Sequence, residues 1–301
     1  MIDLSPNAKI ISASRRTDIP AFYATWMMNR LRAGFAETVN PFNARQVMRV
    51  SLRPQDVIAI VFWTRHPQPL LRHLDELLDR GYRFYFQWTF NRFPRVLEQT
   101  GPAPEKVIDL MHQVAERLSP GHIQWRYDPI ILSEAMSPQW HVENFAFLAE
   151  RVKGATRRCY VSFLDFYKKT RKNLEPLNGP FRVKEPTLQQ QIDLMRKLQK
   201  IAQANNIELY ACCEDHLLEI PGVRKARCVD VEVIHELYPE VAVIRRKLAT
   251  RTQCGCYESK DIGAYDSCLF RCIYCYANAD FHKRSLPRYK KHQPVFSRLI
   301  P

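Results

Sequence analysis

Short apolar runs alternate along the chain with longer segments that have helical periodicity. The runs expected to form strands are residues 9–14, 35–40, 57–63, 83–89, 122–127, 158–164 and 207–213, with 46–52 as an eighth candidate. The segments expected to be helical lie between them, at 73–80, 104–118, 144–153 and 187–206. This alternation is typical of repeated βα units, whose strands form a mainly parallel sheet. The pattern therefore predicts an α/β fold.

The longest expected helix, 187–206, has an apolar face. Its members recur at helical spacing and are Leu188, Ile192, Met195, Leu198 and Ile201. A face of this kind is expected to pack against the rest of the fold.

Polar side chains follow six of the expected strands at the point where each strand ends. They are Arg16, Asp18, Arg65, Asn91, Arg126, Asp128, Asp165 and Glu214. In a parallel α/β barrel the loops after the strands build one common face, which carries the chemistry. Any one of these residues can instead begin a turn or cap a helix, as Asp does in TDIP and YDPI. Their recurrence predicts a TIM-like β/α barrel with a polar mouth.

The composition is that of a globular protein. Of 301 residues, 46% are hydrophobic and 25% charged, which excludes disordered and low-complexity classes. No repeat or linker divides the chain, so we expect one domain over 1–301, in which 254–301 form a cysteine-rich loop and a basic tail. No apolar run of about 18 residues occurs, and the N-terminus does not resemble a signal peptide. We therefore expect a cytoplasmic protein without membrane contact.

Three of the nine cysteines form a compact run near the C-terminus. Cys268, Cys272 and Cys275 have C-x3-C-x2-C spacing, and an aromatic residue, Tyr274, precedes the last of them. Three thiolates from one loop can hold three irons of a four-iron cluster and leave the fourth iron open. Zinc fits less well, because structural zinc takes four ligands in paired C-x2-C knuckles. Buried core cysteines have no reason to keep this spacing.

This run resembles the cluster motif of the radical S-adenosylmethionine enzymes. The resemblance implies a partial or full barrel, a four-iron four-sulfur cluster and S-adenosylmethionine bound at the open iron. It also implies one-electron cleavage of the sulfonium to a 5′-deoxyadenosyl radical, for which the cofactor supplies the chemistry. An electron donor, either a reductase or a ferredoxin or flavodoxin, is implied as a partner.

The same resemblance gives roles to the polar residues of the mouth. Tyr274 is expected beside the adenine, and four further residues are expected to bind the cofactor: Arg65, Asn91, Arg126 and Asp165. The expected catalytic residues are Arg16, Asp18, Asp128 and Glu214. No Gly-Gly-Glu segment is present to hold the methionine end, and Glu214 is the candidate to replace it.

The whole chain is also similar to an uncharacterised bacterial family, a domain of unknown function with a cysteine cluster near its C-terminus. The segments that carry this resemblance are SASRRTDIPAFY, NPFN, FWTRHP, FQWTFN, WRYDPI, CGCYESKDIGAYDSC and CIYCYAN. In ordinary radical enzymes the cluster loop follows the first barrel strand, whereas here it follows all the expected strands. A permuted barrel, in which the cluster loop closes the ring last, reconciles the two.

The other cysteines form a candidate second centre, either an iron–sulfur cluster or zinc. Its expected ligands are Cys212, Cys228, Cys254 and Cys256. Cys213 is expected to point away from Cys212, because neighbours on a strand face opposite sides of the sheet. Cys159, alone within a strand, is expected in the core.

The formal net charge of +14 comes entirely from two stretches. Residues 151–200 hold 13 basic and 4 acidic residues, and residues 276–301 hold 6 basic and 1 acidic. Residues 168–172 and 283–291 place basic side chains beside aromatic ones, as a nucleic acid or another polyanion requires. A solvated basic loop and tail is the simpler interpretation.

A rival hypothesis is a nucleic-acid-binding protein whose cysteines hold structural zinc or iron–sulfur centres. The C-terminal loop would then need a fourth protein ligand, for which Cys256 and His282 are the candidates. A metal-dependent hydrolase lacks the expected histidine and carboxylate ligands. No GxGxxG, GxxxxGK or GxSxG segment occurs.

Overall fold

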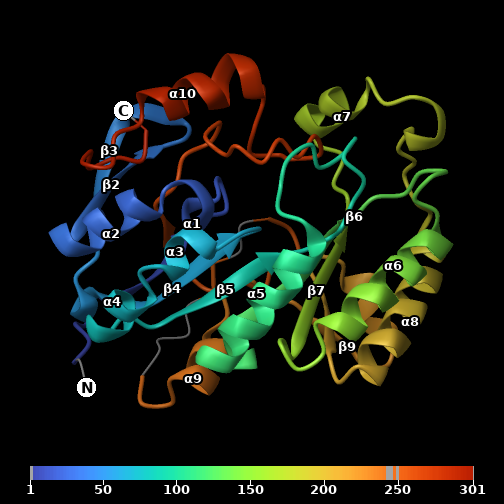
Figure 1. The fold of residues 1–301 in the computed structure, drawn as a ribbon, viewed down its shortest axis with the longest axis horizontal. Coiled ribbons are helices and arrows are strands. Elements are labelled where there is room, and N and C mark those ends of the chain that lie inside the picture. The colour runs from blue at the N-terminus through green and yellow to red at the C-terminus, as the bar shows by residue number, and fades with distance from the viewer. Residues whose placement is uncertain (1–2, 242–246, 249–250, 301) are drawn as a thin grey trace.

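The computed structural model describes residues 3–241, 247–248 and 251–300, and its centre is an eight-stranded sheet (Figure 1). The strand order is β10-β1-β4-β5-β6-β7-β8-β9, and every neighbouring pair is parallel. The strands are β1 (Lys9–Ala13), β4 (Val57–Thr64), β5 (Phe84–Thr89), β6 (Ile123–Ile130), β7 (Arg158–Phe163), β8 (Glu208–Ala211), β9 (Val223–Lys225) and β10 (Ser259–Asp261). The predicted α/β class is therefore confirmed.

Helices connect most of these strands, as parallel pairing requires; β8 and β9 are joined by a short 3-10 helix, and α10 follows the last strand. They are α1 (Ile19–Phe22), α2 (Ala24–Ala33), α3 (Gln68–Leu71), α4 (Leu74–Asp79), α5 (Pro104–Arg117), α6 (Pro138–Arg151), α7 (Lys168–Leu174), α8 (Leu188–Ala204), α9 (Val231–Leu237) and α10 (Leu286–Lys291). In Figure 1, α10 lies at the upper left of the molecule and α7 at the upper right, whereas α9 lies at the lower end. No helix in the described ranges is both long and apolar enough to cross a membrane.

Two predicted strands are correct as strands but wrong as members of the parallel sheet. Residues 35–40 and 46–52 fall in β2 (Phe35–Asn40) and β3 (Asn43–Ser51), which form a separate antiparallel pair. Only Pro41 and Phe42 link them, and a link of two residues joins antiparallel strands but not parallel ones. The strands β9 and β10 were not predicted, because VRK and SKD are short and largely polar.

The two faces of the sheet bury different side chains. On β5, Phe84, Phe86 and Trp88 pack with the helices in the larger core cluster. The alternate residues Tyr85 and Gln87 face the other side, where both donate hydrogen bonds to the Cys228 carbonyl oxygen, at 2.9 and 2.8 Å. The face of the sheet that carries Tyr85 and Gln87 is therefore both polar and apolar, which is more typical of a functional site than of a hydrophobic core.

The helix α8 begins at a capping box, in which the Thr187 hydroxyl accepts from Gln190 N and the Gln190 side chain accepts from Thr187 N. Its buried residues are Leu194, Met195, Leu198 and Ala202. The predicted face is therefore wrong at its start, where Leu188 is 62% exposed. The face is turned toward Leu194 and Ala202 because α8 packs against α6 as well as β8.

The two edge strands of the sheet, β9 and β10, are not paired with each other in the part of the chain that the structure describes. One backbone hydrogen bond joins the segments beside them, from Tyr257 N to Val229 O at 3.1 Å. We call this junction the seam. A closed ring of paired strands, as the barrel prediction requires, is not formed by the described residues. The predicted core position of Cys159 is correct, since its side chain is fully buried in β7.

A buried histidine links α6 to the sheet and should make stability depend on pH. His141 Nε2 donates to the Ile131 carbonyl at 2.9 Å, and Nδ1 accepts from the Tyr127 hydroxyl at 2.8 Å. Burial lowers the pKa of His141 from 6.5 to about 4. Between these two values the unfolded chain binds a proton that the folded chain does not, so stability falls as the pH falls through this range.

The substitution His141→Gln should make the free energy of unfolding less dependent on pH between about 6.5 and 4. Urea unfolding at several pH values measures this slope. His112→Gln is the matched control, because His112 is an exposed histidine on α5. Equal slopes for the wild type and His141→Gln would contradict the assignment.

Candidate functional site

The C-terminal cysteine loop begins where β10 ends beside β1. The Asp261 carboxylate accepts four hydrogen bonds at this point. They come from Ser12 Oγ (3.0 Å), Ser14 Oγ (2.7 Å), Arg15 N (2.9 Å) and Gly263 N (3.0 Å). This carboxylate therefore fixes β10 to the end of β1, and the loop leaves from the carboxyl end of the sheet (Figure 1).

Gly263 is required by the close approach of the loop to β1. A Cβ atom at this position would lie 2.1 Å from Ser14 Oγ and 2.5 Å from Ser14 Cβ. No larger residue fits without moving the loop.

The three cysteines of this loop, Cys268, Cys272 and Cys275, are named the loop thiols, and each is partly exposed. Burial raises the pKa of each of them, to about 12 for Cys272. For Cys268, the negative charges of Asp18, Cys275 and Cys272 raise the pKa further, which places the three thiols near one another. Their loop pairs with the segment after β5, through a bridge between Cys272 and Glu98.

Arg65, which follows β4, contacts the loop directly. Its Nη1 donates to Cys272 Sγ at 3.0 Å, its Nη2 pairs with Glu98, and its guanidinium lies over the Phe270 ring at 5.2 Å. The Arg65 charge opposes the effect of burial on the pKa of Cys272. The Nε atom of Arg65 is buried without a hydrogen-bond partner. Arg65 thus brings positive charge and a spare donor to the loop thiols.

Tyr274 is held by hydrogen bonds at its hydroxyl. It donates to Glu98 Oε1 at 2.5 Å and accepts from Asn91 Nδ2 at 3.4 Å. Its ring packs edge to face against Phe93, with ring centroids 6.0 Å apart. Asn91 also accepts from Asp128 N at 2.8 Å, so β5 and β6 together position this aromatic residue.

Asp18 has a structural role that accounts for both of its oxygens. Oδ1 accepts from Ala21 N at 2.9 Å, which caps α1, and Oδ2 accepts from Arg65 N at 2.6 Å. Burial raises the pKa of Asp18 to about 7. From the sequence, Asp18 could be a residue of the site or a helix cap, and the structure shows the helix cap.

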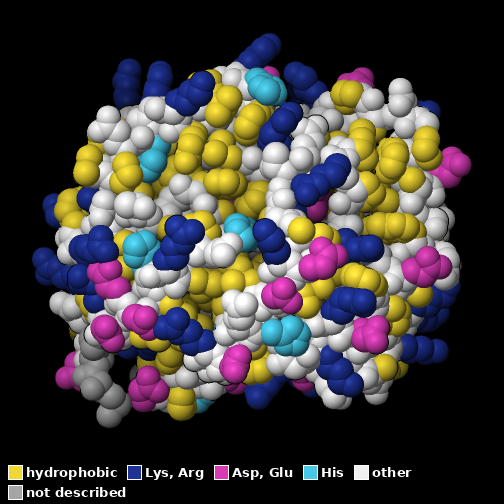
Figure 2. Space-filling view, in the orientation of Figure 1, with side chains coloured by type: hydrophobic (Ala, Val, Ile, Leu, Met, Phe, Trp, Pro, Cys, Tyr) yellow, Lys and Arg dark blue, Asp and Glu magenta, His cyan; other side chains and the backbone are white. Residues whose placement is uncertain are grey.

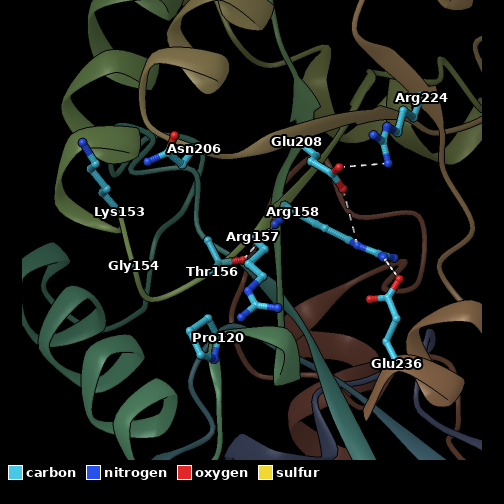
Figure 3. Close-up of a pocket in the computed structure, with 10 residues that line it drawn as sticks. All are labelled: Pro120, Lys153, Gly154, Thr156, Arg157, Arg158, Asn206, Glu208, Arg224 and Glu236. Carbon is cyan, nitrogen blue, oxygen red and sulfur yellow. Dashed lines mark hydrogen bonds and ion pairs between the residues drawn. The ribbon is translucent and has the colours of Figure 1, made fainter. Parts of the chain in front are cut away.

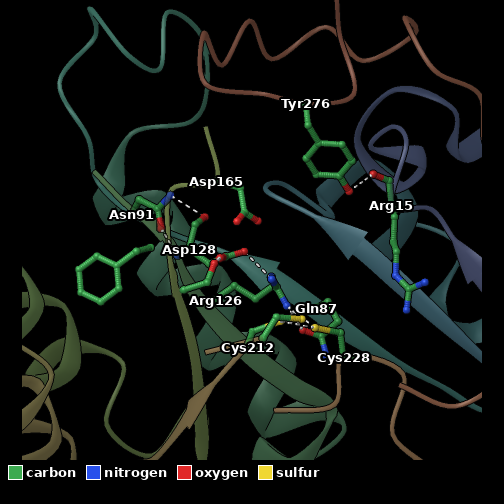
Figure 4. Close-up of polar contacts among 12 residues, drawn as sticks. Arg15, Gln87, Asn91, Arg126, Asp128, Asp165, Cys212, Cys228 and Tyr276 are labelled. Carbon is green, nitrogen blue, oxygen red and sulfur yellow. Dashed lines mark hydrogen bonds and ion pairs between the residues drawn. The ribbon is translucent and has the colours of Figure 1, made fainter. Parts of the chain in front are cut away.

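Arg126 lies on the same face of the sheet as Gln87, between Asp128 and Cys228 (Figure 4). Its Nη1 donates to Cys228 Sγ at 2.9 Å and to Gln87 Oε1 at 3.2 Å, and its Nη2 pairs with Asp128. Asp128 also accepts from the Ser162 hydroxyl. Arg126 therefore connects the polar mouth with a cysteine.

Trp63 lies between two arginines. The guanidinium carbons of Arg15 and Arg126 are 5.1 and 5.2 Å from its ring. Trp63 Nε1 and Arg15 Nη2 are buried and have no hydrogen-bond partner. Above them, the Tyr276 hydroxyl donates to the Arg15 carbonyl at 2.7 Å (Figure 4). Donors without partners beside two positive charges fit a polar or anionic group held at this point.

A second group of cysteines lies at the seam. Cys212 Sγ is 3.6 Å from Cys228 Sγ and 4.0 Å from Cys213 Sγ. Further thiol hydrogen bonds join Cys228 to Cys256, Cys256 to Cys254, and Cys254 to Cys213. The members, which we name the seam thiols, are Cys212, Cys213, Cys228, Cys254 and Cys256.

The prediction that Cys213 points away from Cys212 is wrong. The strand β8 ends at Ala211, so neither cysteine belongs to it. Cys213 has φ of 60°, a left-handed conformation that turns the chain back and brings both thiols to one side. The other four predicted members do lie together.

Arginines surround the seam thiols as well. Arg251 Nε donates to Cys213 Sγ at 3.0 Å, and Arg126 donates to Cys228 from the opposite side. Hydrogen bonds from Cys212 and Cys256, together with the charges of Arg126 and Arg15, hold the pKa of Cys228 well below its usual range. As the side chains stand, no three His, Cys, Asp or Glu residues in the described ranges converge closely enough to hold a single metal ion.

Three predicted residues lie apart from the loop thiols. Asp165 pairs with Arg251 at the rim, and Arg16 lies 3.9 Å from Asp261 and over the Tyr265 ring at 5.2 Å. Glu214 Oε1 accepts from Phe163 N at 2.5 Å. Burial raises the pKa of Glu214 to about 7, and the nearby charge of Asp128 adds to this effect.

The sequence-based reasoning missed several residues that contact the thiols. Glu98 lies nine positions beyond the end of β5, where no strand-end rule points to it. Trp63 lies in the expected strand 57–63, and no feature of the sequence marks Arg251. Cys213 was set aside by the alternation rule. Arg15 lies in the polar run after β1, and this position is the only feature of the sequence that points to a role for it.

The described part of the chain also lines two hollows. One of about 640 Å³ lies near the amino ends of β7 and β8, where Arg158 pairs with Glu236 and Arg224 pairs with Glu208 at 2.9 Å (Figure 3). Its charges are largely paired. The other, of about 580 Å³, lies beside Cys272 and is lined by the basic residues Lys172, Arg271, Lys283 and Arg284.

The fold and the site define an α/β protein with a parallel sheet, in which one group of cysteines follows β10 and another lies at the seam. The chain belongs to the family described as "Domain of unknown function (DUF1848)", whose family model matches residues 10–277. This confirms the predicted membership of an uncharacterised family. The match covers both the loop thiols and the seam thiols.

No curated protein matches the chain. Among solved structures, the chain is 13% identical to a short-chain type dehydrogenase/reductase from Mycobacterium marinum, with a TM-score of 0.24 and coverage of 86% of this chain and 95% of that one. It is 11% identical to a putative short-chain alcohol dehydrogenase from Sinorhizobium meliloti, with a TM-score of 0.24 and coverage of 70% and 72%. Scores this low carry no argument about fold or function.

The substitution Asp261→Asn should loosen the loop thiols from the sheet. Its amide group would face two of the four donors that the carboxylate accepts from, at a cost of about 1–3 kcal/mol in stability. Hydrogen exchange of residues 263–277 should become faster. Asp109→Asn, on the exposed surface of α5, is the control. Unchanged exchange in this loop would show that Asp261 does not hold it.

Proposed function

We propose that this protein is a radical S-adenosylmethionine enzyme in which the loop thiols hold a four-iron four-sulfur cluster. The observation that carries the proposal is the place of β10. In the chain the cysteine loop comes last, but in the sheet it follows an edge strand that precedes β1 in the spatial order. The family that the motif resembles has its cluster loop after the first barrel strand, so the spatial arrangement agrees although the chain order differs.

We propose further that the sheet is a permuted β/α barrel. Its strand order follows the chain without reversal from β1 to β9, and β10 is added before β1. A doubly wound sheet reverses its order at a switch point, and this sheet does not. The hydrogen bond at the seam supports an almost closed ring.

The chemistry of the donor set fits a cluster. Three thiols of one loop at C-x3-C-x2-C spacing suit a cluster, which is larger than a single ion and can take three ligands from one loop. Arg65 donates to Cys272, as hydrogen bonds to cluster sulfurs do when they tune potential. When bound, the cluster and S-adenosylmethionine supply one-electron cleavage of the sulfonium and a 5′-deoxyadenosyl radical.

The residues of this chain would bind and orient. Arg15, Trp63 and Arg126 offer charges and free donors for the polar ends of the cofactor or substrate. Asp128, which pairs with Arg126, lies near Glu214, and a buried carboxyl at this point can bind an amino group or hold a proton. Tyr274 stays the candidate for the adenine, with its hydroxyl fixed by Glu98.

The rival interpretation needs a fourth protein ligand for the loop thiols. Of its two candidates, Cys256 hydrogen-bonds with Cys228 and Cys254 in the seam group. His282 is exposed and has Nε2 3.5 Å from Arg271 Nη2. Both contacts favour a loop with three ligands and an open iron.

Cleavage of S-adenosylmethionine tests this proposal. Protein reconstituted with iron and sulfide, kept free of oxygen and reduced with dithionite should form 5′-deoxyadenosine. Cys272→Ala should reduce product to background, whereas Cys159→Ala, which alters a core cysteine, should not. Equal amounts of product from the wild type and from Cys272→Ala would contradict the proposal. So would the absence of product from wild-type protein that holds its cluster, when extracts that could contain the substrate are added.

The basic hollow beside Cys272 is the proposed docking site of an acidic electron donor such as a flavodoxin. Lys169 Nζ, on α7, donates to the Tyr276 carbonyl at 3.1 Å, so this helix rests on the cysteine loop. Basic side chains also stand along the upper margin of the molecule, at the end where α7 and α10 lie (Figure 2). A nucleic acid or phosphorylated substrate at the same basic surface is a second partner, whose binding should weaken steeply with salt.

Reversing two charges of this hollow should slow reduction by flavodoxin. Lys172→Glu with Lys283→Glu should raise the KM for the protein donor, because like charges then repel it. Reduction by dithionite, which needs no docking, should keep its rate. Lys197→Glu with Lys200→Glu on α8 is the matched control. A KM equal to that of this control would rule out docking at the hollow.

A further inference from the structure

The seam thiols come from three parts of the chain that are far apart in sequence. Two follow β8, one follows β9 and two precede β10. They therefore reach the seam from both edges of the sheet, at the place where one backbone hydrogen bond joins those edges. Five of the nine cysteines are joined in one chain of thiol contacts, which needs a reason beyond apolar packing.

We propose that four of the seam thiols bind a second metal centre, an iron–sulfur cluster or a zinc ion, which links the two edges of the sheet. This inference goes beyond the proposed function and does not depend on it. Thiolate sulfur is the shared chemistry, because both centres are held by four cysteine thiolates.

The distances agree with shared coordination. A Zn–S bond of about 2.3 Å places two tetrahedral ligands about 3.8 Å apart. The Sγ atoms of Cys212 and Cys228 are 3.6 Å apart, and those of Cys212 and Cys213 are 4.0 Å apart. The thiols form a chain of such contacts and do not yet converge on one point, so binding requires rotation of side chains. Because there are five seam thiols and four ligand positions, more than one set of four thiols could bind the metal.

The surroundings suit a negatively charged centre. Arg126 donates to Cys228 at 2.9 Å from the inside of the sheet, and Arg251 donates to Cys213 at 3.0 Å from the rim. Arg251 Nη2 also lies 3.9 Å from Cys212 Sγ. Four thiolates around either centre leave net negative charge, which buried guanidinium groups compensate. Thiols that served only as apolar packing would gain nothing from two arginines.

Arg126 connects this centre with the mouth. The same guanidinium contacts Cys228 and Asp128 (Figure 4). It also lies over the Trp63 ring. The second centre would therefore hold Arg126 through its contact with Cys228, and Arg126 Nη2 would stay directed toward Asp128. The second centre would in this way position Arg126.

Metal analysis of a variant without the loop thiols tests the proposal. The full chain carrying Cys268→Ala, Cys272→Ala and Cys275→Ala is isolated without oxygen, and its iron, zinc and sulfide are measured. We expect about four irons with sulfide, or about one zinc, per chain. Iron with a visible absorption band identifies a cluster, and zinc without one identifies an ion.

Two further variants assign the metal to the seam. Adding Cys228→Ser and Cys256→Ser to this background should reduce the metal content to near zero, whereas adding Cys159→Ser should not. Removing the metal from the triple variant with a chelator should also increase hydrogen exchange in β9 and β10. This hydrogen-exchange measurement uses only the triple variant, so it does not depend on whether the serine variants fold.

A triple variant that holds neither metal, yet folds as judged by circular dichroism, overturns the proposal. So does a Cys212–Cys228 disulfide found by mass spectrometry in protein isolated without oxygen, since the thiols would then form a redox pair. These results concern only the seam, and so they leave the outcome of the 5′-deoxyadenosine assay separate.

Discussion

The pairing of β10 with β1 determines where the chemistry of this protein can lie. Three residues of β10 are sufficient because Asp261 accepts four hydrogen bonds from the end of β1 and from Gly263. This carboxylate converts a cysteine loop at the end of the chain into a loop at the carboxyl end of the sheet. A second attachment lies after β5, where Ile273 N donates to the Leu97 carbonyl at 3.0 Å and holds the loop beside Arg65.

Arginines connect the two groups of thiols. Arg65 contacts the loop thiols, Arg126 contacts the seam thiols, and Arg15 and Arg126 lie on Trp63 between them. Buried guanidinium groups are costly unless they have partners of opposite charge. Here carboxylates such as Glu98 and Asp128 supply part of that charge, and thiolates can supply the rest. Both groups of thiols thus lie beside positive charge.

The sequence predicts the long regular parts of the fold and the identity of the thiols. Strands such as β5 and helices such as α8 have periodic apolar patterns, and C-x3-C-x2-C is specific in spacing alone. The sequence does not reveal β10, whose pairing rests on one carboxylate, nor the separation of β2 and β3 from the main sheet. Cys213 and Glu98 were missed because a left-handed φ and a long-range hydrogen bond leave no local pattern.

The binding of S-adenosylmethionine at an open iron tests the central claim most directly. Electron paramagnetic resonance of the reduced protein, in a Cys212→Ser/Cys228→Ser background that removes the seam centre, isolates the signal of the loop cluster. Our account predicts a four-iron signal whose g values change when S-adenosylmethionine is added and which is lost in Cys272→Ala. A signal that S-adenosylmethionine leaves unchanged would contradict it, since all four irons would then have protein ligands.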